Sequence, residues 1–205
     1  YVNNKCVTRF DYKIYKNDVI SVKQGRCEVD ILYEDNDLIA VNKEAGLLTV
    51  SIDNKDTKTL YKEVSKYVKT KNKNNKVFIV NRLDRDTSGI VLFAKNQISY
   101  DILLSKFKSH EIEKHYYAWV YSVPSEKSKK MTAFLFKDTK KSLVYISDVP
   151  KKGYQKIITS YSVVKIYDNN TCLLDVQIET GKTHQIRAHL AYVGLPIIGD
   201  GKYGK

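Results

Sequence analysis

Three short segments of the chain gather the polar side chains that could do chemistry. They cover residues 82–84 (Arg-Leu-Asp), 114–116 (Lys-His-Tyr) and 183–187 (Thr-His-Gln-Ile-Arg). The first segment lies between two apolar runs, where charged residues cost free energy unless they have a task. The three segments hold a carboxylate, a phenol, imidazoles and guanidinium groups, side chains that can act in chemistry as well as in packing. We therefore expect an active site built from these segments.

A metal centre is not expected. His184 and His189 are five residues apart, so they do not share a helix face, and no carboxylate follows at ligand spacing. The cysteines Cys6, Cys27 and Cys172 are odd in number and lack CxxC spacing, which argues against both zinc and a disulfide framework. A reducing, cytoplasmic location is the expectation.

The elements that must position these residues are mostly strands. Apolar runs or alternation predict strands at 30–35, 38–41, 77–80, 90–94, 116–123, 160–166 and 173–178. Helical spacing predicts helices at 57–69 and 98–107, and a third that opens at 181–183 and ends at Gly194. No apolar run approaches the roughly 18 residues of a membrane helix. The pattern indicates an α+β protein with no membrane partner.

Four sequence blocks resemble those of the RluA-like RNA pseudouridine synthases. Asn81 to Asn96 reads NRLDRDTSGIVLFAKN and resembles the family pattern HRLDxxTSGLLLxAK. Gly181 to Gly204 reads GKTHQIRAHLAYVGLPIIGDGKYG and is similar to TGRTHQIRxHLxxxGxPIxGDxxYG. NKxxG at Asn42 to Gly46 and KxYxAxV at Lys114 to Val120 occur in the family's order. The resemblance implies the pseudouridine synthase catalytic fold, a long mixed, largely antiparallel sheet flanked by helices.

The resemblance also implies roles for individual residues. Asp84 matches the nucleophilic aspartate, and Arg187 matches the arginine that pairs with it and keeps it ionised. Tyr116 matches the tyrosine that stacks on the flipped uracil and takes the C5 proton in the final step. Arg82 matches a residue that enters the gap left by the extruded base.

Two lysines are expected to contact RNA. Lys43, in the NKxxG block, resembles a basic residue near the active-site cleft, and Lys182 replaces a commoner arginine of the family. The implied reaction converts uridine to pseudouridine in ribosomal or transfer RNA without cofactor or metal, and we expect a monomer. A formal net charge of +12 fits an RNA partner, although a lysine-rich composition with solvated lysines explains it equally well.

The resemblance begins near Val29, so a second part of the chain is expected before it. Residues 1–27, with an Asn17-Asp18 turn signal, resemble the end of an S-four-like RNA-binding domain. Residues 28–205 are the predicted catalytic domain, which we expect to be truncated at its C-terminus because family members usually continue further.

Two departures from the family pattern leave an alternative open. The chain has Asn81 where the family usually has His, and Glu44 where it usually has Pro. A catalytically silent RNA-binding protein on the same fold would tolerate both. Asp84 could then form a structural ion pair at a turn, and Tyr116 could simply pack in the core. A hydrolase with paired carboxylates is a weaker alternative, because the sequence offers no convincing second acid.

Overall fold

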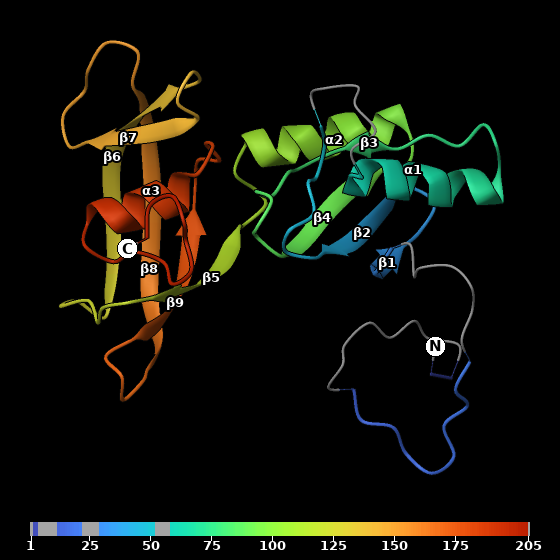
Figure 1. Ribbon diagram of the computed structural model, residues 1–205. Coiled ribbons are helices and arrows are strands. Elements are labelled where there is room, and N and C mark those ends of the chain that lie inside the picture. The colour runs from blue at the N-terminus through green and yellow to red at the C-terminus, as the bar shows by residue number, and fades with distance from the viewer. Residues whose placement is uncertain (1, 4–11, 22–28, 52–57, 205) are drawn as a thin grey trace. The chain divides into compact units, whose positions relative to one another are not determined.

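The chain divides into two compact units, Tyr1–Lys108 and Ser109–Lys205, each with its own sheet (Figure 1). The α+β class is therefore confirmed. The described strands form two sheets rather than one long sheet, and within them every ladder is antiparallel. No described helix has the length and apolar composition needed to cross a membrane. The computed structural model describes residues 2–3, 12–21, 29–51 and 58–204.

The sheet of the first unit has four strands in the order β1-β2-β4-β3. The central pair, β2 and β4, is antiparallel from Leu38 opposite Ala94 to Lys43 opposite Gly89. The end of β2 therefore lies beside the start of β4, directly after the segment that contains Asp84. The strands are β1 (Ile31–Glu34), β2 (Leu38–Lys43), β3 (Phe78–Ile79) and β4 (Gly89–Ala94).

Two helices accompany this sheet. In α1 (Leu60–Lys71), the Thr59 side chain caps the N-terminus by accepting a hydrogen bond from the Lys62 N–H at 3.3 Å. The buried α1 residues recur at i, i+4 and i+8, and they pack with β2 and β4 in one apolar core. In α2 (Gln97–Lys108) no residue is fully buried. Both predicted helices are confirmed, with boundaries shifted by one to three residues.

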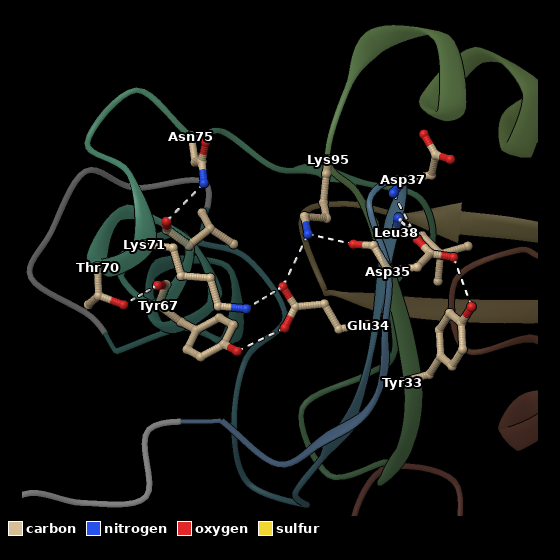
Figure 2. Close-up of polar contacts among 11 residues, drawn as sticks. Tyr33, Glu34, Asp35, Asp37, Leu38, Tyr67, Thr70, Lys71, Asn75 and Lys95 are labelled. Atoms are coloured by element: carbon tan, nitrogen blue, oxygen red, sulfur yellow. Dashed lines mark hydrogen bonds and ion pairs between the residues drawn. The ribbon is translucent and has the colours of Figure 1, made fainter.

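A polar cluster around Glu34 ties α1 to the sheet (Figure 2). The Glu34 carboxylate accepts hydrogen bonds from Lys71 Nζ at 2.8 Å, Tyr67 Oη at 2.8 Å and Lys95 Nζ at 3.1 Å. Burial alone would raise the pKa of Glu34, but these three donors outweigh it and lower the pKa below its usual value. The cluster therefore stabilises the first unit only while Glu34 is ionised.

The Glu34 cluster predicts an acid-sensitive first unit. The folded-state pKa lies below the unfolded-state pKa, so the stabilisation is present above the unfolded value of about 4.3. It is lost as the pH falls through the folded value. We expect the difference in urea unfolding midpoint between wild type and Glu34→Gln to be largest near neutral pH and to shrink toward pH 3. Glu44→Gln, which removes an exposed carboxylate of the same unit, should show no such difference. A Glu34→Gln effect independent of pH would contradict the assignment.

The sheet of the second unit has five strands in the order β5-β9-β8-β6-β7. One face is buried, and Leu190 of α3 (Gln185–Tyr192) joins its core, so Figure 1 shows α3 lying across this sheet. The sequence pattern predicted β5, β8 and β9 but missed β6 and β7. In β6, phenylalanines at 134 and 136 alternate with buried residues, which hides the period of two. The strands are β5 (His115–Val120), β6 (Ser128–Asp138), β7 (Leu143–Ser147), β8 (Gln155–Ile166) and β9 (Cys172–Ile178).

The N-terminal segment contains the predicted turn. The Asp18 N–H donates to the Tyr15 carbonyl at 3.0 Å, and Val2 and Ile20 form an antiparallel bridge across it. The proposed boundary between residues 27 and 28 lies outside the described residues. The origin of residues 1–27 from an RNA-binding domain therefore stays a prediction.

Candidate active site

Asp84 begins a tight turn between β3 and β4. The turn is closed by the Thr87 N–H, which donates to the Asp84 carbonyl at 3.2 Å. Asp84 itself is half-buried, whereas Arg85 and Asp86 at the tip of the turn are exposed. The position suits a carboxylate that must be both oriented by the protein and accessible to a substrate.

Lys43 supports this turn from below. Its ammonium group donates to the carbonyls of Glu44 at 2.9 Å, Leu47 at 2.7 Å and Arg85 at 2.8 Å, which uses all three of its protons. The Gly46 N–H also donates to the Arg85 carbonyl at 2.9 Å, from a backbone with φ of 88° that favours glycine. The residue after Asp84 is therefore held from two sides.

The charge of Lys43 is balanced by the same turn. Burial lowers the pKa of Lys43, while the carboxylates of Asp86 and Asp84 act in the opposite direction. The structure therefore brings Lys43 and Asp84 together.

The predicted RNA contact of Lys43 does not fit this geometry. The residue is 0% exposed, and its three protons are already donated to backbone carbonyls. Its contacts favour a role in holding the Asp84 turn. Lys182 differs, because it is exposed in the loop before α3 and only its backbone N–H is seen to donate, to Gln185 Oε1 at 3.1 Å.

This contrast predicts opposite behaviour for two substitutions. Lys43→Met leaves buried carbonyls without a donor, so we expect it to lower the free energy of unfolding by about 1–3 kcal/mol. The salt dependence of RNA binding should stay unchanged. Lys182→Met should leave stability unchanged and reduce the slope of log affinity against log salt by about 1. Denaturant unfolding and RNA binding across a salt series measure both quantities. A Lys43→Met protein of normal stability with a reduced salt slope would restore the RNA contact.

Asn81 has a structural task in this chain. Its Oδ1 accepts the Leu92 N–H at 2.7 Å, and its Nδ2 donates to the Ile90 carbonyl at 3.2 Å. The side chain thus continues the pairing of β3 with β4 past the end of β3. Asn81, which stands where the family usually has His, therefore attaches the start of the Asp84 segment to the sheet. Arg82, the next residue, is exposed.

In the second unit, Arg187 of α3 forms a two-pronged ion pair with Asp200. Its Nε lies 2.7 Å from Asp200 Oδ2, and its Nη2 lies 2.9 Å from Asp200 Oδ1. Burial alone would raise the pKa of Asp200, but Arg187 and the backbone N–H groups of Lys202 and Tyr203 lower it to about 2. Asp200 therefore stays ionised and fixes the guanidinium. The pairing of Arg187 with Asp84 links residues of different units and stays a prediction.

The start of α3 is fixed by a buried polar network. Gln185 Nε2 donates to the Ile158 carbonyl and to Thr159 Oγ1, each at 3.1 Å. His189 Nδ1 lies 3.0 Å from the same Thr159 hydroxyl, and burial lowers the pKa of His189. His184 precedes the helix with a φ of 52°, and its Nδ1 lies 2.8 Å from Tyr203 Oη. Both histidines are hydrogen-bonded, and the network sets the direction of α3.

Tyr116 lies in β5 with its side chain on the buried face of the sheet. It is half-buried and packs against the core cluster that includes Leu190 of α3. Tyr117 points to the opposite face and is 77% exposed, as the alternation of a strand requires. Tyr116 is thus supported from below by the same core as the helix of Arg187.

Three residues that contact candidate residues or their backbone, each within its own unit, were not predicted to have a role. Asp200 and Tyr203 fall in the GDGKYG end of the C-terminal block, so the pattern pointed to them without indicating a contact. Thr49 contacts the backbone beside Asp84, and no pattern in the sequence distinguishes it from other threonines.

Comparison with known proteins gives concordant matches. Residues 37–192 match the family model described as RNA pseudouridylate synthase. A ribosomal large subunit pseudouridine synthase C of Rickettsia felis is 36% identical over 181 residues, which cover 85% of this chain and 55% of the relative. An uncharacterized RNA pseudouridine synthase of Bacillus subtilis is 31% identical over 216 residues, covering 99% of this chain and 70% of the relative. The chain thus spans little more than half the length of some relatives.

Solved structures agree at the level of the fold. The structure of human RNA pseudouridylate synthase domain containing 4 superposes with a TM-score of 0.71 at 23% identity. The superposition covers 85% of this chain and 68% of that chain. At this identity the match establishes the architecture of strands and helices.

Proposed function

Because the chain belongs to the RNA pseudouridylate synthase family, we propose that it isomerises uridine to pseudouridine within RNA, with Asp84 as nucleophile. The observation that carries the assignment is the Asp84 turn. Asp84 is half-buried, and the backbone on both sides of it is held by buried groups from β2 and the following loop. A pre-oriented carboxylate is what a covalent isomerisation requires.

The reaction rearranges bonds without net gain or loss of atoms. The bond between C1′ of ribose and N1 of uracil breaks, the base turns, and a bond forms between C1′ and C5. The proton on C5 then leaves, and N1 gains one. We propose that an Asp84 carboxylate oxygen bonds to C1′ as the C1′–N1 bond breaks, and that this bond breaks again when C5 bonds to C1′, so that the carboxylate is released unchanged.

Tyr116 is proposed to complete the proton transfer. Its ring is held against the core of the second unit, which suits a surface on which a uracil stacks. Its hydroxyl is the proposed acceptor of the C5 proton. Arg187, fixed by Asp200, is the proposed partner that keeps Asp84 ionised.

The target uridine must leave its helix before Asp84 can reach it. Extruding a base costs a few kcal/mol, and the exposed Arg82 is proposed to fill the vacated space. The net charge of +12 supports binding to a polyanion. Relatives named for the ribosomal large subunit favour ribosomal RNA over transfer RNA as the substrate. Incubating the chain with each RNA separately distinguishes the two.

Tritium release from RNA labelled at uridine C5 tests the proposed activity. A synthase releases tritium and forms no free uracil, because the base is rejoined to the same sugar. A silent RNA-binding protein would bind with the same fall of affinity in salt but release nothing. A hydrolase would release uracil. Binding without tritium release from ribosomal or transfer RNA would overturn the proposal.

A further inference from the structure

Thr49 is a buried residue outside any helix or strand that contacts the backbone directly before Asp84. Its side chain is almost fully enclosed, with 3% of the residue exposed. Its Oγ1 donates to the Leu83 carbonyl at 2.8 Å and accepts from the Leu83 N–H at 3.2 Å. One hydroxyl therefore satisfies both backbone groups of the residue that precedes the proposed nucleophile.

Thr49 is itself held by the start of α1. Its carbonyl accepts the Tyr61 N–H at 3.1 Å, and the neighbouring Leu48 carbonyl accepts the Leu60 N–H at 2.9 Å. The first N–H groups of a helix have no carbonyl partner within the helix, and here the carbonyls of Leu48 and Thr49 accept two of them. Leu60 in turn is buried in the core of the first unit. The hydroxyl is thus anchored to a rigid helix.

We propose that the Thr49 hydroxyl is a positioning group for the Asp84 carboxylate, which it sets through the backbone of Leu83. The proposal rests on the assignment of Asp84 as nucleophile. Leu83 has both backbone groups held by Thr49, and Arg85 has its carbonyl held by Lys43 and Gly46, so the residue between them has little freedom. A misplacement of about 1 Å in a reacting group can cost about 100-fold in rate.

The two flanking contacts are different in kind. Lys43 carries a charge that acts on Asp84 directly, whereas Thr49 is neutral and can act only through geometry. Removing the Thr49 hydroxyl should therefore change the rate of the chemical step without changing the affinity for RNA. A residue that merely stabilised the fold would change neither in protein that remains folded.

The test compares Thr49→Val, which keeps the shape and removes the hydroxyl, with Thr49→Ser, which keeps the hydroxyl. We expect Thr49→Val to lower kcat by about 10- to 100-fold with KM within about twofold, and Thr49→Ser to stay within about threefold of wild type. The matched control is Thr171→Val, which removes another buried hydroxyl, one that accepts from Trp119 Nε1 in the second unit. Its kcat should be that of wild type.

The outcomes separate this inference from the proposed function. If Asp84→Asn is inactive while folded Thr49→Val has the kcat of wild type, the positioning role is wrong and the proposed function stands. If Asp84→Asn is fully active, the nucleophile assignment fails, and the positioning role fails with it. Should Thr49→Val not fold, Thr49→Cys replaces it, because a thiol is a weaker hydrogen-bonding group of similar size. Its kcat must then fall below that of Thr49→Ser for the inference to hold.

Discussion

Replacing Asp84 by Asn is expected to lower the rate of tritium release from C5-labelled RNA by about 10⁴-fold or more. The amide has nearly the shape of the carboxylate but carries no negative charge and is a poor nucleophile. The contacts that form the turn involve the backbone of residues 83–87 and the Lys43 ammonium, so the substitution should leave them in place. RNA affinity should change by no more than a few fold, because the substitution removes only one charge.

Asp86→Asn is the matched control for this experiment. Asp86 lies in the same turn and is exposed. Its replacement by Asn removes a carboxylate that, like that of Asp84, interacts with the charge of Lys43. A general loss of negative charge near Lys43 would affect both variants alike, whereas loss of the nucleophile affects Asp84→Asn alone. Similar losses in the two variants would show that the turn, and not the Asp84 carboxylate, limits the rate.

Replacing Tyr116 by Phe is expected to lower kcat by about 10²- to 10⁴-fold, the range that general base catalysis contributes. The ring that stacks on the base is retained, so RNA affinity should be nearly unchanged. Loss of the hydroxyl removes the acceptor of the C5 proton, which makes this proton transfer slow. Deuterium at C5 should therefore slow Tyr116→Phe more than it slows the wild-type chain.

Tyr117→Phe controls for the loss of a phenol on the same strand. Tyr117 is the next residue of β5 and points to the exposed face of the sheet. Its hydroxyl has no place in the proposed chemistry, so Tyr117→Phe should have the kcat and isotope effect of wild type. A Tyr116→Phe variant with normal kcat would leave the residue only its packing role.

The order and type of most elements could be predicted because the first unit is regular. The apolar runs that became β2 and β4 are buried, and α1 buries residues at i, i+4 and i+8. Such periodicity is a local property, so the sequence displays it. The strands β6 and β7 were missed, and in β6 the phenylalanines at 134 and 136, on the face opposite the buried residues, conceal the alternation. The place of β6 in the sheet is fixed by its pairing with β8, and β7 joins the sheet through β6.

The motifs that contain the candidate residues could be read from the sequence, whereas the residues that hold them in place could not. Asp84, Tyr116 and Arg187 stand in blocks whose spacing is specific. Thr49 contacts Leu83, 34 residues away in the sequence, and Asp200 contacts Arg187, 13 residues away. No local pattern reveals contacts between residues so far apart. Folding alone brings such pairs together.

Lys43 shows a different limit of sequence reasoning. A lysine in a basic chain is normally exposed, and only the fold buries this one under a turn whose carbonyls and carboxylates compensate its charge. The same residue type thus serves a structural task at 43, while Lys182 remains exposed and available to a polyanion. Net charge alone cannot separate the two cases.

Nucleoside analysis of one RNA after incubation with the wild-type chain and with Asp84→Asn decides whether the Asp84 carboxylate makes pseudouridine. The RNA is digested completely, and pseudouridine, uridine and free uracil are quantified. We expect pseudouridine from the wild-type chain, none from Asp84→Asn, and no free uracil from either protein. Equal pseudouridine from both proteins would contradict this expectation.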